Sequence, residues 1–186
     1  AAGYYRTPKI HWDMETMQGR PFFYYAYGAA ICEVVIDTLT GENRCLRADI
    51  IHDVGASLNP AIDKGQVEGA FVQGMGWLTM EELWWDKEGR LRTHAPSTYK
   101  IPGSRDVPPH FQVHLLENSP NKENTVYRSK AVGEPPLMLA TGVWLALRDA
   151  IANSADKALP VDLDAPATPE RILFAVEDQR RRAAAA

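Results

Sequence analysis

The chain has 186 residues, of which 45% are hydrophobic and 24% are charged, and its formal net charge is −4. This composition is that of an ordinary globular domain, and the weak negative charge gives no bulk attraction to nucleic acid or to an anionic membrane surface. No stretch reaches the apolar length of a membrane-spanning helix, and residues 1–9 lack the apolar core of a signal peptide. The length allows one domain with its own core, or part of a larger one.

Cys32 and Cys45 are the only cysteines. They are too few for an iron–sulfur cluster or a structural zinc site, so any such centre needs ligands from elsewhere. If their segments form a hairpin the two thiols could face each other, but the sequence does not decide whether they pair. We expect reduced, buried thiols in a cytoplasmic protein.

A β-hairpin is predicted near the start of the chain. Residues 22–37 and 44–52 are rich in β-branched or aromatic residues, and the second run alternates between apolar and polar side chains. Gly41 lies between the two runs and can adopt the positive φ that a tight turn requires. Two such runs around a turn residue are typical of a hairpin.

A long helix is predicted after the hairpin. Asn59 can accept a hydrogen bond as the N-cap, and Pro60 suits the first turn. The apolar positions between residues 61 and 83 fit one face of this helix. Four glycines lie within it: Gly65, Gly69, Gly74 and Gly76. Because glycine lowers helix stability, we expect the backbone there to approach another helix or a ligand closely.

The second half of the chain adds a strand and two helices. Residues 86–110 are turn-rich, and residues 111–116 are typical of a strand. A helix with one apolar face is predicted over residues 137–154, and Thr168 is suited to cap a last helix. The alternation of hairpin, helix, strand and helix predicts an α+β fold, in which a mixed sheet or hairpin is packed against helices.

Glu134 is the residue most suggestive of chemistry. It stands between Gly133 and the pair Pro135-Pro136, just before an apolar helix. The prolines restrict the backbone and would hold the carboxylate in one direction, as a general base requires. The alternative is a glutamate that only complements the dipole of the helix it begins.

Gln66 and Gln73 form a second candidate site. They lie seven residues apart, so on a helix they share one face. Their amides could hydrogen-bond a polar heterocycle or an oxo group, because an amide both donates and accepts. Packing of helices through the neighbouring glycines, with both glutamines in solvent, is the alternative.

Two pairs of polar residues are weaker candidates for a functional site. Lys130 and Arg128 precede the Glu134 loop and could bind an anion, although unpaired surface cations are the commoner case. His52 and Asp53 could belong to a metal or relay site. No second histidine stands at ligand spacing, so a hydrogen-bonded pair at a strand end is the expected arrangement, and no side chain is predicted as a metal ligand.

Several of these runs resemble those of xanthine dehydrogenases, which are members of the molybdenum hydroxylase family. The resemblance is carried by these segments: residues 52–63, 65–69, 96–102 and 129–136. Nearly all of residues 4–179 can be placed in the family's C-terminal molybdenum-binding region, and residues 163–171 most resemble the bacterial two-subunit type. We therefore expect residues 1–182 to be the C-terminal part of the molybdopterin-binding domain. Residues 183–186, behind three arginines, are expected to be a frayed or disordered tail.

The resemblance also implies the site and its reaction. The cofactor would be molybdenum–molybdopterin, contacted by Gln66, with Lys130 and Gly133 lining the same pocket. Glu134 corresponds to the family's catalytic base, which takes a proton as hypoxanthine and xanthine are hydroxylated to urate. An aldehyde or other N-heterocycle oxidase of the same superfamily is an alternative, and so is a non-catalytic assembly module.

The resemblance further implies partners that this chain does not contain. The remainder of the molybdenum subunit would complete the site, and electrons would pass to 2Fe-2S clusters and FAD on other segments or subunits. We expect a cytoplasmic dimer of catalytic units that acts on purines and binds neither nucleic acid nor membrane. The chain by itself is expected to be inactive and to bind the cofactor weakly or not at all.

Overall fold

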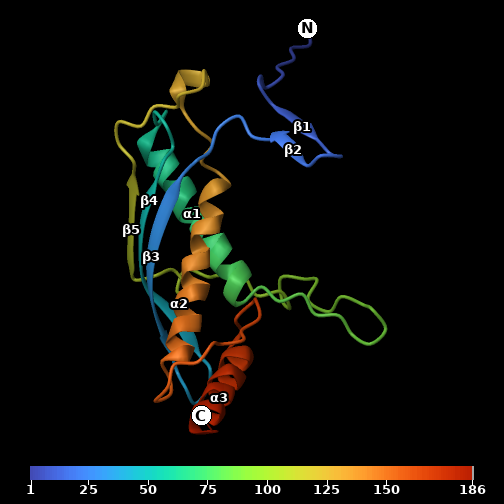
Figure 1. Ribbon diagram of the computed structural model, residues 1–186, viewed down its shortest axis with the longest axis vertical. Coiled ribbons are helices and arrows are strands. Elements are labelled where there is room, and N and C mark those ends of the chain that lie inside the picture. The colour runs from blue at the N-terminus through green and yellow to red at the C-terminus, as the bar shows by residue number, and fades with distance from the viewer. Residues whose placement is uncertain (186) are drawn as a thin grey trace.

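A three-stranded mixed sheet forms one side of the computed structural model, which describes residues 1–185 (Figure 1). β3 (Gly28–Ile36) and β4 (Asn43–His52) form an antiparallel hairpin, and β5 (His110–Leu115) pairs with β4 in parallel. β4 is therefore the middle strand. The predicted hairpin and the predicted α+β class are confirmed.

The hairpin turn depends on Gly41, which has φ +74°. A side chain at this position would collide with the backbone carbonyl of Pro169, so the turn also fixes where the last helix begins. The Asp37 carboxylate accepts the Leu39 N–H at 2.7 Å and closes the other side of the turn. β3, the first strand of this hairpin, is shorter than predicted, because residues 22–27 lie outside the sheet. Most of them line a groove together with residues 119–123.

α1 (Pro60–Thr79) begins as predicted. The Asn59 side chain accepts the N–H of Ile62 at 3.3 Å, and Pro60 occupies the first turn. The predicted end of this helix, at residue 83, was wrong, because the helix ends four residues earlier, at Thr79. It ends because the N–H groups of Met80 and Glu81 both bond back to the Gly76 carbonyl, at 2.9 Å, which turns the chain away from the helix axis.

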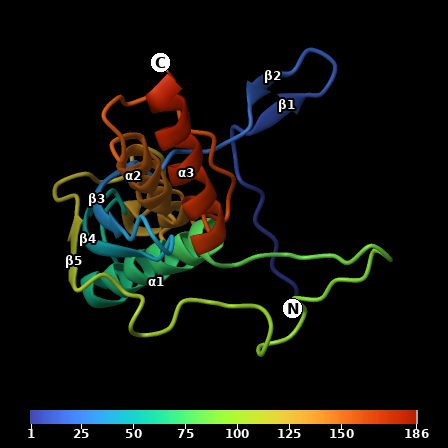
Figure 2. The ribbon, with the colours of Figure 1, turned by 90° about the horizontal axis from the view of Figure 1, so that it is seen from below.

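α2 (Thr141–Ala152) covers the inner face of the sheet together with α1 (Figures 1 and 2). It is preceded by two short 3-10 helices, η1 (Val126–Arg128) and η2 (Pro135–Ala140). The largest fully buried side chains include Ile50, Val67, Phe71, Leu147, Ile151, Ile172 and Val176. These side chains come from β4, α1, α2 and the last helix, so one core joins the sheet to all of them. The opposite face of the sheet is exposed, with Ile31 and Ile51 among its residues.

α3 (Pro169–Ala185) packs on α2 at the end of the molecule far from η1 (Figure 1). Gln179 is fully buried and donates to the carbonyls of Ala152 and Lys157 at 3.0 and 3.1 Å. The helix continues through Ala185, so most of the expected tail, residues 183–186, is helical, and only residue 186 lies outside the described part. The domain boundary at 182 stays a prediction.

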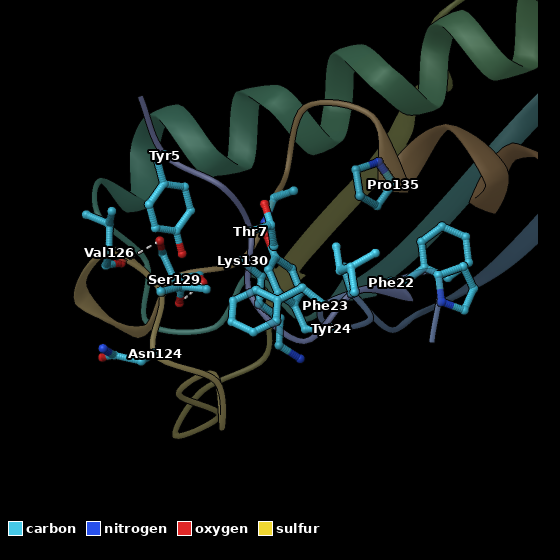
Figure 3. A pocket seen from close by; sticks show the side chains of 15 residues that line it. Tyr5, Thr7, Phe22, Phe23, Tyr24, Asn124, Val126, Ser129, Lys130 and Pro135 are labelled. Atoms are coloured by element: carbon cyan, nitrogen blue, oxygen red, sulfur yellow. Dashed lines mark hydrogen bonds between the residues drawn. The ribbon is translucent and has the colours of Figure 1, made fainter. Parts of the chain in front are cut away.

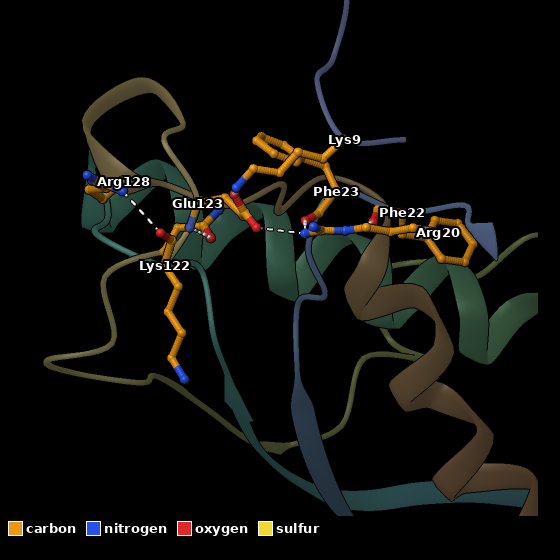
Figure 4. Close-up of polar contacts among 8 residues, drawn as sticks. Lys9, Arg20, Phe22, Phe23, Lys122, Glu123 and Arg128 are labelled. Carbon is orange, nitrogen blue, oxygen red and sulfur yellow. Dashed lines mark hydrogen bonds and ion pairs between the residues drawn. The ribbon is translucent and has the colours of Figure 1, made fainter. Parts of the chain in front are cut away.

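Two segments extend away from the body of the molecule (Figures 1 and 2). One is a hairpin of β1 (His11–Asp13) and β2 (Gln18–Arg20), which the sequence did not suggest. Glu123 fastens it, because its carboxylate pairs with Lys9 at 2.7 Å and Arg20 at 2.6 Å (Figure 4). The other is the turn-rich stretch between α1 and β5. No helix within residues 1–185 is long and apolar enough to cross a membrane.

The glycines of α1 divide into packed and open positions, and this division is testable. A side chain at Gly74 would overlap the Leu137 carbonyl and lie 2.8 Å from the Ala140 Cβ, whereas one at Gly65 would meet nothing within 4 Å. We expect Gly74→Ala to destabilise the chain by about 1–2 kcal/mol through overpacking. Gly65→Ala, the matched control, should stabilise it by about 0.5–1 kcal/mol through helix propensity. Urea unfolding of both variants checks this, and equal effects would contradict the assigned packing.

Candidate active site

The segment 128–134, which we call the strap, carries Glu134 along the end of β4. The Lys130 N–H donates to the Val54 carbonyl at 2.8 Å. Gly55 pairs with Ser129 in an isolated antiparallel bridge, and its φ of +67° suits glycine. A side chain at Gly55 would lie 3.0 Å from the Lys130 nitrogen, so the absence of one lets the strap approach. The strap is thus fixed to β4 through its backbone.

A buried ion pair also holds the strap. The Lys130 Nζ lies 2.6 Å from the Asp53 Oδ2, and the two side chains are only 9% and 4% exposed. Lys130 also donates to the Tyr25 carbonyl at 2.9 Å, and its ammonium group lies 5.3 Å from the centre of the Tyr27 ring. The predicted free or anion-binding cation is therefore not what the structure shows, since the charge of Lys130 is already neutralised inside the chain.

The surroundings of Asp53 favour its ionised form. Burial alone would raise its pKa, but the hydrogen bonds from Lys130 and the Gly55 N–H, together with the Lys130 charge, hold that pKa below its ordinary value. The Gly55 N–H donates to Oδ1 at 2.8 Å, so both carboxylate oxygens have partners. Sequence reasoning missed this role, because Asp53 and Lys130 are 77 residues apart and no spacing links them.

His52 does not form the expected pair with Asp53. It is 1% exposed, and neither ring nitrogen has a hydrogen-bond partner among residues 1–185. Its Nδ1 would lie 2.7 Å from a Cβ built on Gly28, so the ring fills space that the glycine leaves open. Burial lowers the pKa of His52, the nearby Lys130 charge lowers it further, and Asp53 opposes both effects. The ring is a neutral core residue rather than a relay.

Glu134 occupies the position before η2, with its side chain exposed. Its backbone carbonyl accepts the Leu137 N–H at 3.1 Å, but its carboxylate makes no capping hydrogen bond. Pro135 and Pro136 form the first turn, and Pro136 is fully buried, which anchors the backbone directly behind the carboxylate. The backbone of Glu134 is therefore fixed, whereas its carboxylate is exposed and uncapped.

Gln66 and Gly133 are brought together, although they come from α1 and the strap. A Cβ built on Gly133 would lie 3.5 Å from the Gln66 Oε1, and both residues are exposed. Gln73 is also exposed on α1, two turns further along. Of the predicted site residues, the structure places Gly133 beside Gln66, and Glu134 is the next residue along the strap, whereas the Lys130 ammonium group points into the ion pair.

A groove of about 960 Å³ lies beside the strap (Figure 3). Its wall is formed by the N-terminal segment, by residues 21–26 and by the loop that leads into the strap. The lining residues include Tyr5, Ile10, Phe22, Phe23, Tyr24, Val126, Ser129, Lys130, Ala131 and Pro135. The lining contains neither Glu134 nor Gln66. The groove therefore adjoins the Glu134 loop at Ala131 and Pro135.

Comparison with known proteins identifies the family. The family model of the molybdopterin cofactor-binding domain matches residues 1–108, which is more than half of the chain. The chain therefore belongs to the molybdopterin cofactor-binding domain family, as the resemblance of its motifs predicted.

The relatives extend the match over almost the whole chain. It is 54% identical over 184 residues to xanthine dehydrogenase/oxidase of Rattus norvegicus, which covers 96% of this chain and 14% of the rat protein. It is 47% identical over 182 residues to aldehyde oxidase 1 of Macaca fascicularis, with the same two coverages of 96% and 14%. The solved structure of quinoline 2-oxidoreductase from Pseudomonas putida 86 is similar, with a TM-score of 0.69 and 30% identity over 78% of this chain and 18% of that one. The chain thus spans a small part of the relatives that it matches.

The polar groups around Gln66 fit a molybdopterin cofactor. The Gln66 amide both donates and accepts, and it lies beside the exposed backbone of Gly133. Gly65 and Gly69 leave the same end of α1 bare, so a flat ring system could approach the helix backbone. Within residues 1–185, no group of three His, Cys, Asp or Glu side chains could hold a metal ion.

The buried state of His52 predicts a pH dependence of stability. Its pKa in the folded chain lies below the value of about 6.5 expected for the unfolded chain. As the pH falls below about 6.5, the unfolded chain binds a proton that the folded chain binds less readily, so the free energy of unfolding decreases. We expect His52→Met to make this decrease shallower between about pH 7 and 5, as measured by urea unfolding at each pH. His94→Met, at an exposed position, is the control, and identical slopes for His52→Met and wild type would contradict the prediction.

Proposed function

We propose that this chain is the C-terminal part of the molybdenum-binding subunit of a purine hydroxylase, which converts hypoxanthine and xanthine to urate. The observation that carries the proposal is the arrangement at the strap. It brings Gly133 to Gln66 and leaves the Glu134 carboxylate exposed, uncapped and fixed at its base. The substrate class is supported by the xanthine dehydrogenases among the relatives, such as the rat protein at 54% identity. Identity alone does not separate them from aldehyde oxidases, because an aldehyde oxidase and a plant xanthine dehydrogenase both match at 47%.

Each residue then has a distinct task. Gln66 and the backbone of Gly133 hold the polar edge of the cofactor, for which an amide and a bare peptide group are suited. Glu134 accepts the proton that must leave as the substrate carbon is hydroxylated. When bound, the molybdenum–molybdopterin cofactor supplies the oxidising metal that receives the electrons of the substrate. Pro135 and Pro136 keep the carboxylate in one direction, which limits the reorganisation needed at the moment of proton transfer.

The rest of the enzyme enters the proposal as partners. The remainder of the molybdenum subunit completes the cofactor site, and 2Fe-2S and FAD centres on other segments or subunits take the electrons. We further propose a dimer of such catalytic units in the cytoplasm.

A second candidate function is oxidation of aldehydes or of N-heterocycles other than purines. It is supported by the similarity to an aldehyde oxidase and to the structure of a quinoline 2-oxidoreductase. The two functions share the Glu134 chemistry and differ in residues outside this chain. Steady-state turnover of xanthine, quinoline and benzaldehyde by the intact enzyme separates them.

Glu134→Gln tests the proposed base. In the intact enzyme at matched molybdenum content, we expect kcat for xanthine to fall by about 10²- to 10⁴-fold, because an amide cannot accept the proton. Glu88→Gln is the control, since Glu88 lies in the stretch that extends away from the body between α1 and β5. Turnover by Glu134→Gln at the wild-type rate would show that the carboxylate is structural. Absence of xanthine turnover in a molybdenum-replete wild-type enzyme would favour the second candidate function.

Gln66→Ala tests the proposed cofactor contact. Loss of an amide hydrogen bond should weaken cofactor binding by about 3- to 10-fold, so the intact enzyme should retain less molybdenum after extended dialysis. The matched control is Gln112→Ala, which changes an exposed glutamine on β5 and should leave the molybdenum content unchanged. Equal retention by both variants would remove Gln66 from the cofactor site.

A further inference from the structure

The strap that carries Glu134 has few apolar anchors of its own. Residues 128, 131, 133 and 134 are all exposed, and no side chain of the strap enters the core cluster except the partly buried Val132. Arg128 and its neighbour Tyr127 both have positive φ, a conformation that non-glycine residues adopt at an energetic cost. The position of the strap therefore depends on polar contacts.

Lys130 provides the most buried of these contacts, and it joins three segments. Its ammonium group binds Asp53, directly after β4, and the carbonyl of Tyr25, in the stretch before β3. Its own backbone N–H bonds the Val54 carbonyl, and the next N–H, of Ala131, donates to the Tyr24 hydroxyl at 2.9 Å. One side chain thus fixes the strap to the end of β4 and to the stretch before β3 at the same time.

We propose that the Asp53–Lys130 ion pair is the positioning device of the site: it holds the strap so that Glu134 and Gly133 stay at their working places beside Gln66. The assignment of a reaction to Glu134 rests on the proposed function, but the tether itself does not. Neither Asp53 nor Lys130 has to touch the cofactor or the substrate. Lys130 is only four residues from Glu134, so a shift of the strap moves the carboxylate directly, and a displacement of about 1 Å can cost about 10²-fold in rate.

A charge-cancelling double variant separates positioning from simple stabilisation. Asp53→Asn leaves the Lys130 ammonium buried and unpaired, and Lys130→Met does the same to the carboxylate, so each single change is destabilising. The double variant D53N/K130M removes both charges and should recover most of the stability, but it cannot restore the tether. The matched control is R47M/D49N, which removes an exposed ion pair on the outer face of the sheet.

Three measurements on the intact enzyme decide the question: the thermal midpoint, amide hydrogen exchange of residues 128–136, and steady-state turnover. For D53N/K130M we expect a near wild-type midpoint, faster exchange in the strap with unchanged exchange in α2, and a kcat about 10- to 100-fold lower at unchanged KM. R47M/D49N should match wild type in all three. The inference is overturned if D53N/K130M recovers the midpoint and also keeps wild-type exchange and kcat, because the pair then only stabilises the fold.

The two proposals fail in different ways. If Glu134→Gln turns over at the wild-type rate, the proposed function fails, and the exchange of the strap alone then decides whether the ion pair tethers it. If Glu134→Gln is inactive while D53N/K130M is fully active with a protected strap, the proposed base stands and the positioning role is lost.

Discussion

The site depends on one buried ion pair, between Lys130 and Asp53. Two unit charges taken out of water are costly unless their partners satisfy them, and here the carboxylate has the ammonium group and a backbone N–H, while the ammonium group has a second acceptor and an aromatic ring. Such a pair tolerates little displacement. It therefore fixes the strap relative to β4, and with it the loop of Glu134. β4 is in turn held by its pairing with β3 and by the core beneath it.

α1 has two different surfaces, and the glycines mark the boundary between them. Gly74 lets η2 pack against the helix, so its small size is a requirement of the core. A side chain at Gly65 would meet nothing within 4 Å in the described chain, and Gln66 beside it is exposed near Gly133. The first surface builds the fold, and the second is left open at the place where the proposed cofactor would lie. Of the two alternatives considered for these glycines, close packing therefore holds at Gly74, and approach to a ligand stays a prediction for Gly65.

Local sequence signals predicted most elements of the fold. Asn59 and Pro60 start α1, Gly41 turns the hairpin, and the alternating runs on either side form its strands, since these features act over a few residues. Two features were not predicted. α1 stops at Thr79, where the N–H groups of Met80 and Glu81 both bond to the Gly76 carbonyl, a local arrangement that the apolar pattern does not mark. The β1–β2 hairpin is fastened by ion pairs to distant Glu123. No periodicity in the sequence reports either constraint.

The sequence by itself determined the family, the α+β class and the two motifs that contain Gln66 and Glu134. These could be predicted because sequence motifs and the patterns that form helices and strands extend over only a few neighbouring residues. Only the tertiary structure decided that Gln66 and Gly133 are neighbours, and that Lys130 is a buried partner of Asp53 rather than a free cation. The physical reason is that burial and charge pairing arise when segments far apart in the chain pack together. A lysine in the sequence looks the same whether it faces solvent or a carboxylate 77 residues away.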